Sequence, residues 1–340
     1  MIFFYLLSLT IFILIINKFL LKKNILISET GDIHQKFASK SSVPLTGGLF
    51  IFAGYLYFLN EKIFSFILFS FIVFILGIFS DLKIIKSAKK RFLLQIFLIL
   101  SYVIFNDVQI NHTRMVFLDN ILHNNYINYL FVTFCILIII NGSNFIDGMN
   151  TLCVGYYLLI SATIFYLQLN EIIIIKDVSI FYIFILILFV FLLNLTNKVY
   201  LGDSGSYLLG FSFSIFLISI YKFNEHISPF FIVLLLWYPS YENLFSIIRK
   251  RILKRSPMTP DTNHFHQLVF FFIKKRYKMQ NLFANLITAQ IINFYNLIIF
   301  LIGLNFINNT KGQILLILLS VTLYTLLYIK LFKFKYQKSV

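Results

Sequence analysis

The sequence predicts an all-α, polytopic membrane protein with ten or eleven transmembrane helices. Of its 340 residues, 59% are hydrophobic and 12% are charged, and the mean hydropathy is +0.87. A soluble domain would carry about 25% charged residues. The apolar residues come in blocks of about 20, the length that crosses a bilayer core as a helix. They do not alternate with polar residues, as the strands of a membrane β-barrel would require.

Eleven apolar segments account for the predicted helices. The first is longer than the apolar region of a signal peptide, and Lys22 and Lys23 follow it rather than precede it, so we expect it to be retained as a span. No linker rich in Pro, Gly or Ser and no internal repeat is evident, so a single domain over residues 1–340 is expected. The predicted spans are 2–21, 44–60, 63–80, 91–106, 126–141, 151–169, 178–195, 204–221, 228–248, 282–304 and 313–332.

Positive charge is concentrated in alternate loops. With the N-terminus outside, the inner loops contain 23 of the 29 Lys and Arg residues and the outer loops contain 5. This is the positive-inside pattern of a multi-pass protein of the cell (inner) membrane, and it places the C-terminus in the cytoplasm. The net charge of +16 is then explained by topology and by attraction to membrane lipid, and it does not indicate nucleic-acid binding.

The polar segments that could carry chemistry all fall on the predicted inner face. A chain without a site would scatter such residues over both faces. An acidic cluster inside a basic, apolar chain is costly to keep, so it is expected to bind a metal or to handle protons. The segments are Pro44–Gly48, Asp81, Asn141–Asn150, Gly202–Ser206 and Asp261–His266.

The segment Asn141–Asn150 has oxygen-bearing side chains at three-residue steps. Asn144, Asp147 and Asn150 would share one helical face if the helix continued through them. Oxygen ligands suit a hard cation such as Mg²⁺, which keeps waters and bridges to substrate phosphates. The alternative is simple helix capping by Asn and Asp at the membrane boundary.

The segment Gly202–Ser206 opens the eighth predicted span. Its glycines permit close approach of the backbone, and the free N–H groups of a helix start favour phosphate. Asp203 is negative and would repel a phosphate bound there unless a divalent ion bridges the two. The alternative is a helix cap with a glycine turn. Gly47 and Gly48, at the start of another span, are expected to serve close helix packing.

His264 and His266 follow Asp261 in a loop rich in Arg and Lys. No Cys and no His pair at helical spacing supports a zinc site, and imidazoles beside basic residues are better suited to a diphosphate. The alternative is a surface His pair. Glu242 lies deep in the ninth predicted span, where an acid is a functional candidate, and the alternative is an ion pair with Arg249 or another basic residue.

Together, these segments resemble the polyprenyl-phosphate N-acetylhexosamine-1-phosphate transferase superfamily, which is glycosyltransferase family 4 and includes phospho-MurNAc-pentapeptide translocase. The resemblance covers about residues 34–270. It is carried by the sequences NFIDGMN, GDSGSYLLG and PDTNHFH, and VPLTGG and WYPSYENLFSIIRK support it.

The resemblance implies transfer of a sugar-1-phosphate from a UDP-N-acetylhexosamine to undecaprenyl phosphate at the cytoplasmic face, with release of UMP. It implies a Mg²⁺ cofactor, with Mn²⁺ as a substitute, and leaves a homodimer open. The implied metal ligands are Asn144 and Asp203. The implied catalytic residues are Asp81, Asp147 and Asp203, and the implied substrate-binding residues are Asn150, Gly205, Ser206, His264 and His266.

Three positions depart from the family pattern. The family's paired Asp is Ser80-Asp81 here, the second Asp of its DGxD pattern is Asn150, and the third His of its loop is Gln267. Lipid phosphate is already largely ionised near pH 7, so loss of one carboxylate is tolerable. Because Asn144 and Asp203 are both retained, we expect an active enzyme.

Two other readings remain open at this level. A transporter or lipid flippase would show inverted repeats and acids at mid-bilayer, and Glu242 is the one acid that looks deep. Within the resembled family, the alternative is the peptidoglycan translocase itself. The sequences HFHQ and YLGDSGS favour, over that translocase, an enzyme that initiates a surface polysaccharide, such as O-antigen in lipopolysaccharide or another cell-wall glycan.

Overall fold

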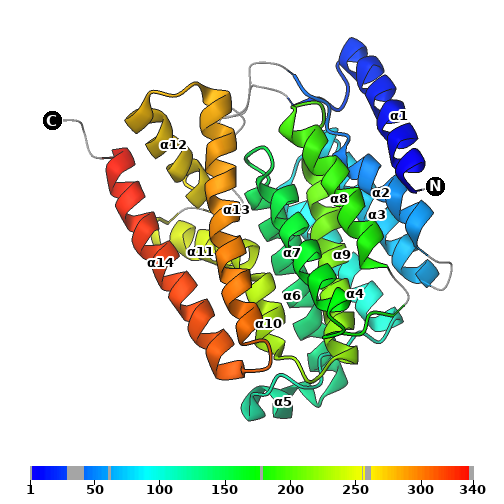
Figure 1. Cartoon of the computed structure of the whole chain (residues 1–340), viewed down its shortest axis with the longest axis vertical. Coiled ribbons are helices and arrows are strands. Elements are labelled where there is room, and N and C mark those ends of the chain that lie inside the picture. Colours follow the sequence, from blue (N-terminus) through cyan, green and yellow to red (C-terminus); the bar gives the residue numbers. More distant parts are fainter. Residues whose placement is uncertain are drawn as a thin grey trace.

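The computed structural model describes residues 2–28, 42–59, 63–176, 179–254, 256 and 262–336. Within these residues the chain forms fourteen helices and no β-strand beyond one isolated bridge between Ile27 and Pro44. The predicted all-α fold is confirmed (Figure 1). The helices are α1 (Ile2–Lys23), α2 (Gly47–Phe58), α3 (Phe64–Asp81), α4 (Ala88–Phe105), α5 (Val116–Leu122), α6 (Asn125–Ile146), α7 (Leu152–Leu169), α8 (Ile180–Leu195), α9 (Gly202–Phe223), α10 (Pro229–Leu235), α11 (Trp237–Ile252), α12 (Phe265–Tyr277), α13 (Asn281–Asn305) and α14 (Thr310–Tyr336).

Each predicted span corresponds to a helix or to a pair of helices. In the described part of the chain, seven helices are long and apolar enough to cross a membrane, and an eighth span results if α10 and α11 are counted together. The helices α2 and α8 are apolar but shorter. The protein is therefore a multi-pass membrane protein, as its hydropathy predicts.

The ninth predicted span, 228–248, is wrong as a single helix. It is broken at Leu236 into α10 and α11, which are bent by 71° relative to each other. Pro239 occupies the first turn of α11, where its missing N–H costs little, so this residue suits a new helix start. The bend turns α11 and its acid, Glu242, out of the direction of α10.

Two helices lie where only loops were expected. In the predicted outer loop 107–125, the short helix α5 packs on α6 at the lower end of the bundle in Figure 1. In the polar segment 249–281, α12 packs against α13 and α14 near the opposite end. Both are too short or too polar for hydropathy alone to identify them.

The helix α9 forms the centre of the bundle. Every residue from Ser204 to Ile215 is buried, and α2, α3 and α6 all pack against this helix. The Phe211 ring stacks on Phe66 of α3 at 5.8 Å and meets the edge of Tyr102 of α4 at 5.1 Å. This packing fixes the first turn of α9 relative to the ends of α3 and α6.

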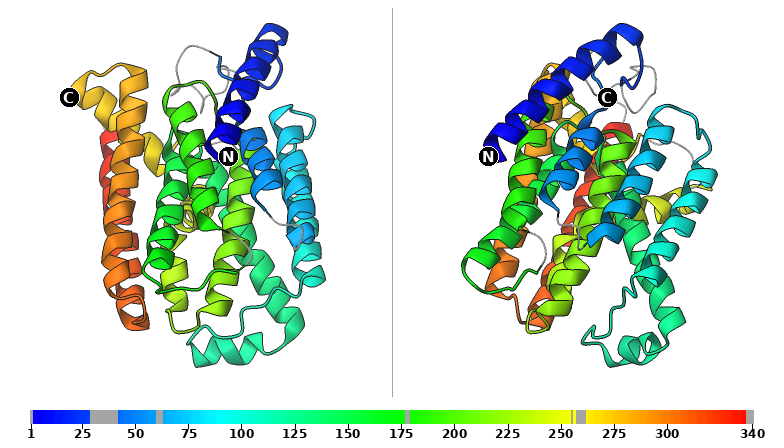
Figure 2. Two further views of the ribbon diagram at one scale, coloured as in Figure 1. Left: turned by 45° about the vertical axis from the view of Figure 1, so that its right-hand side comes forward. Right: turned by 90° about the vertical axis from the view of Figure 1, so that its right-hand side faces the viewer.

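The helices α1 and α14 lie at the periphery of the bundle (Figure 2). Both expose large apolar side chains along most of their length, such as Phe4 and Phe12 in α1 and Leu318 and Leu326 in α14. Exposed apolar side chains on a spanning helix face the lipid tails, so they incur no cost of contact with water.

Candidate active site

A cavity of about 1080 Å³ lies at the end of the bundle where α3 and α6 end and α4 and α9 begin. All five predicted polar segments contribute lining residues, and the segment Pro44–Gly48 contributes Leu45 alone. The predicted clustering of these segments is therefore present in the structure. Its polar lining includes Ser80, Asp81, Arg91, Asn144, Asp147, Asn150, Asp203, Lys250, His264 and His266.

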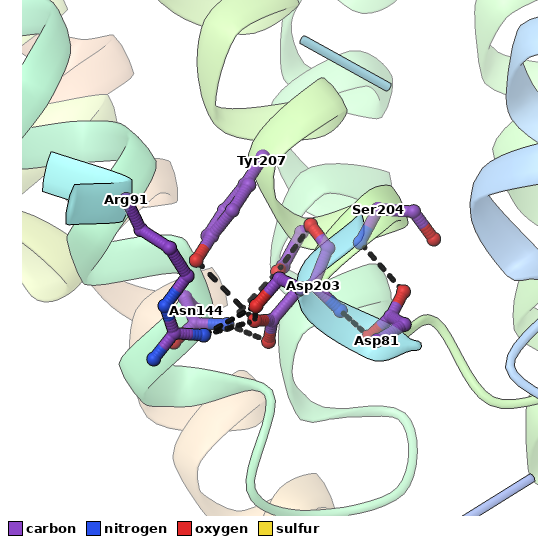
Figure 3. Close-up of polar contacts among 8 residues, drawn as sticks. Asp81, Arg91, Asn144, Asp203, Ser204 and Tyr207 are labelled. Carbon is purple, nitrogen blue, oxygen red and sulfur yellow. Dashed lines mark hydrogen bonds and ion pairs between the residues drawn. The ribbon is translucent and has the colours of Figure 1, made fainter. Parts of the chain in front are cut away.

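The carboxylate of Asp81 caps the N-terminus of α9 (Figure 3). Its Oδ1 accepts the backbone N–H of Asp203 at 2.8 Å, and its Oδ2 accepts that of Ser204 at 3.0 Å. Gly202, immediately before, has φ +70°, and a Cβ there would lie 2.9 Å from Asp81 Oδ2. Asp81 thus holds Asp203 by its backbone, and glycine is required for the carboxylate to approach.

Asp203 is the residue on which the polar contacts of the cavity converge (Figure 3). Its Oδ1 accepts a bond from Asn144 Nδ2 at 2.5 Å. Its Oδ2 accepts bonds from Arg91 Nη1 at 2.9 Å, from Tyr207 at 3.3 Å and from the hydroxyl of Ser80.

Sequence reasoning missed Arg91 and Tyr207. The signal available for Arg91 was its position: it is a basic residue in the first turns of the helix that follows Asp81. Tyr207 lies one helical turn after Asp203.

Asp147 is the C-cap residue of α6 and faces the same cavity. It accepts a hydrogen bond from the backbone N–H of Gly202. Desolvation, and then the negative charges of Asp203 and Asp81, raise the pKa of Asp147 well above its usual range. These surroundings therefore favour the protonated form of Asp147.

The expected shared face of Asn144, Asp147 and Asn150 is wrong beyond Asp147. The helix α6 ends at Ile146, and the chain turns through Thr151, which has φ +67°. Asn150 still lines the cavity, but its Nδ2 donates to Asn197 and its backbone N–H donates to Asn285 at 2.9 Å. Asp147 is the C-cap of α6 and the left-handed Thr151 is the N-cap of α7, so no single helix runs through Asn150.

Gly205 and Ser206 lie in the first turns of α9, behind the cavity wall and outside its lining. A Cβ on Gly205 would lie 3.0 Å from the backbone nitrogen of Gly48, so the two glycines allow α2 and α9 to touch. The packing role predicted for Gly48 is confirmed. Ser206 Oγ donates to the carbonyl oxygen of Asp203 at 3.3 Å.

The two histidines lie at the start of α12, on the cavity wall. His264 Nδ1 is 2.8 Å from Glu242 Oε1, and Glu242 Oε2 accepts the hydroxyl of Tyr324 at 2.6 Å. Glu242 thus has His264 and Tyr324 as partners. Tyr324, from α14, was also missed. Asp261 lies outside the described residues.

Gln267 helps to start α12. Its Oε1 accepts the backbone N–H of His264 at 3.0 Å, which completes a capping box. His266 is fully buried beside Gly148. Burial, and then the neighbouring His264, lower the pKa of His266 to about 3, so its imidazole is neutral near pH 7.

The donor set at Asp203 fits Mg²⁺ better than zinc. Asp203 carries two carboxylate oxygens and Asn144 an amide oxygen, which would have to turn toward the metal because Nδ2 of Asn144 is the atom that faces Asp203 here. Mg²⁺ is commonly held by one or two carboxylates together with water and substrate phosphates. Across the described ranges, no three His, Cys, Asp or Glu side chains gather as a zinc site requires.

Comparison with known proteins finds one similar family. Residues 63–221 match glycosyl transferase family 4. The match covers slightly less than half of the chain. The match contains Asp81, Asn144, Asp147 and Asp203, as well as the unpredicted Arg91.

Two curated relatives are similar over most of the chain. It is 29% identical over 240 residues to the "Probable undecaprenyl-phosphate N-acetylglucosaminyl 1-phosphate transferase" of Bacillus subtilis (strain 168). It is 28% identical over 228 residues to the "Undecaprenyl-phosphate alpha-N-acetylglucosaminyl 1-phosphate transferase" of Thermotoga maritima. The alignments cover 68% and 67% of this chain, and 66% and 68% of the relatives.

Proposed function

We propose that this protein belongs to glycosyl transferase family 4 and transfers N-acetylhexosamine-1-phosphate from a UDP-sugar to undecaprenyl phosphate at the cytoplasmic membrane face, with release of UMP. The names of both relatives specify an undecaprenyl-phosphate acceptor and an N-acetylglucosaminyl 1-phosphate group. N-acetylglucosamine is therefore the first donor sugar to test. The reaction would begin a surface glycan.

The observation that carries this proposal is the convergence on Asp203 of an amide, an arginine and two hydroxyl groups at a cavity wall. Phosphoryl transfer between two anions requires charge neutralisation and alignment more than covalent chemistry. Mg²⁺ held by Asp203 and Asn144 would supply part of that neutralisation. Arg91, Lys250 and Arg251 line the same cavity and add fixed positive charge.

One side of the cavity suits a polyprenyl chain. Its lining there is apolar and comes from α4, α6 and α11, with several side chains partly exposed. Such a surface can take a hydrocarbon tail directly from the bilayer while the phosphate remains near Asp203. These residues are Phe92, Phe134, Leu137, Ile138, Leu244 and Ile247.

The two remaining acids have different parts in this scheme. Both oxygens of Asp81 are used by backbone N–H groups, so it positions Asp203. Asp147 is the acid suited to hold or to accept a proton, because its surroundings disfavour the charged form. The histidine end of the cavity, with Lys250, is assigned to the donor diphosphate.

The test is UMP release by membranes that contain the protein, supplied with undecaprenyl phosphate, Mg²⁺ and a panel of UDP-sugars. We expect UMP with UDP-N-acetylglucosamine or another UDP-N-acetylhexosamine, and none from an Asp203→Asn variant at equal protein content. UMP only with UDP-MurNAc-pentapeptide would favour the peptidoglycan translocase. No UMP with any donor would reject the enzyme and favour the transporter.

A further inference from the structure

The first turns of α4 present a polar face to the cavity that extends beyond Asp203. Ala88, Arg91, Phe92 and Gln95 all line the cavity, and their spacing places them on one side of the helix. The Arg91 side chain is 28% exposed, whereas Gln95 is 3% exposed. A partly accessible guanidinium is thus followed, one turn later, by a buried amide.

Gln95 has a buried hydrogen-bond donor without a partner. Its Oε1 accepts a bond from Asn141 Nδ2 at 3.0 Å, and the same Nδ2 donates to the carbonyl oxygen of Leu137 at 2.9 Å. The second bond fixes the orientation of the Asn141 amide, and through it that of Gln95. Among the described residues nothing accepts a bond from Gln95 Nε2. Buried donors are normally satisfied, so this one indicates an oxygen acceptor that enters the cavity.

Arg91 also has N–H donors that do not bind Ser80 or Asp203. Its hydrogen bonds to Ser80 and Asp203 both use Nη1. The guanidinium has further N–H donors on Nη2 and Nε, in a planar fork that matches phosphate oxygens. Ser80 is neutral where the resembled family has an Asp, so this position adds no second carboxylate to hold Arg91.

The location of this pair favours a lipid phosphate over a nucleotide. Arg91 is adjacent to Phe92, and the Asn141 that holds Gln95 lies one turn after Leu137 and Ile138. Those apolar residues form the part of the cavity wall that suits a polyprenyl chain. A phosphate bound by Arg91 and Gln95 would therefore lie between that wall and Asp203.

We propose that Arg91 and Gln95 bind the phosphate group of the polyprenyl acceptor. This inference rests on the proposed function for the identity of the acceptor, but it can be tested without turnover. The variants are Arg91→Gln, Arg91→Lys and Gln95→Met. Lys90→Gln is the matched control, because Lys90 is the exposed neighbour of Arg91 and does not line the cavity.

The measurement is the dissociation constant of each purified, detergent-solubilised full-length variant, by calorimetry in EDTA. The probes are farnesyl phosphate, farnesol and UDP-N-acetylglucosamine. We expect Arg91→Gln to weaken farnesyl phosphate binding about tenfold or more, as loss of a charged hydrogen bond implies. Arg91→Lys and Gln95→Met should lose less, and farnesol and the nucleotide sugar should bind as in the wild type. Melting temperatures verify that each variant is folded.

Several outcomes would overturn the inference. One is that Arg91→Gln binds farnesyl phosphate as the wild type does, and another is that Lys90→Gln loses as much farnesyl phosphate affinity as Arg91→Gln. The others are that the wild type does not bind farnesyl phosphate, and that Arg91→Gln loses affinity for the nucleotide sugar alone. A wild type that releases UMP while Arg91→Gln binds farnesyl phosphate normally would reject this inference and leave the proposed function intact. If farnesyl phosphate binding depends on Arg91 but the protein releases no UMP, this inference stands and the proposed function is rejected.

Discussion

The carboxylate of Asp81, the last residue of α3, binds the backbone N–H groups of Asp203 and Ser204 and so caps α9 from a different helix. A negative charge at a helix N-terminus is stabilising, and here it also fixes the backbone of the residue on which the cavity contacts converge. The cap on the central helix and the geometry of the proposed metal ligand therefore depend on one side chain.

Asp81→Asn should lower both stability and activity. Only one oxygen would remain to accept an N–H, and the new amide N–H₂ would face the second donor. Loss of a buried acceptor of this kind costs about 1–3 kcal/mol. We expect a lower melting temperature in detergent and slower UMP release, whereas Asp107→Asn, at an exposed position at the other end of the bundle, should change neither. Slower turnover at unchanged stability would instead indicate that Asp81 acts in proton transfer.

Gly202→Ala tests the approach of Asp81 to α9. The new Cβ would lie 2.9 Å from Asp81 Oδ2, on a backbone with φ +70° that disfavours any side chain. We expect a loss of about 1–3 kcal/mol in stability, with reduced UMP release. Gly312→Ala is the control, because a Cβ there meets its nearest atom at an ordinary 3.4 Å. Equal melting temperatures for the two variants would contradict the tight approach.

The sequence predicts the spans and the one-sided placement of the polar segments, because bilayer thickness and hydropathy determine both. It also indicates Asp203 and Asn144 as partners through their motifs. It does not show that Arg91 reaches Asp203, or that Tyr324 of α14 reaches Glu242. These contacts join positions 112 and 82 residues apart, and packing rather than any local pattern brings them together.

The break at Leu236 was unpredictable for a related reason. Residues 228–248 have the composition of one span, and Pro239 is equally compatible with a kink or with a new helix start. The bent helix α11 places Glu242 against His264, and hydropathy does not encode this contact.

Glu242 and Tyr324 should matter for use of the donor although neither lines the cavity. Glu242 fixes His264 through Nδ1, which leaves Nε2 as the nitrogen available to a ligand. We expect Glu242→Gln and Tyr324→Phe to raise the KM for the UDP-sugar more than they lower kcat. The KM for undecaprenyl phosphate should stay near the wild-type value. Tyr126→Phe, at an exposed position at the start of α6, is the control. Equal changes in both KM values would exclude a role confined to the donor.

His266 should make the protein less stable in mild acid. Its pKa of about 3 in the folded state lies below the unfolded value of 6.5, because burial disfavours the imidazolium. Between these values the unfolded chain binds a proton that the folded chain does not, so stability falls as pH decreases from about 6.5. At pH 5 the expected loss is about 2 kcal/mol relative to neutral pH.

The measurement is the difference in melting temperature between pH 7.5 and pH 5. We expect His266→Asn to reduce this difference, whereas His123→Asn, at an exposed position, should leave it as in the wild type. If His266→Asn kept the full acid sensitivity, then His266 would be protonated in the folded protein. Its imidazole would in that case be a cation in the cavity wall, able to pair directly with a substrate phosphate.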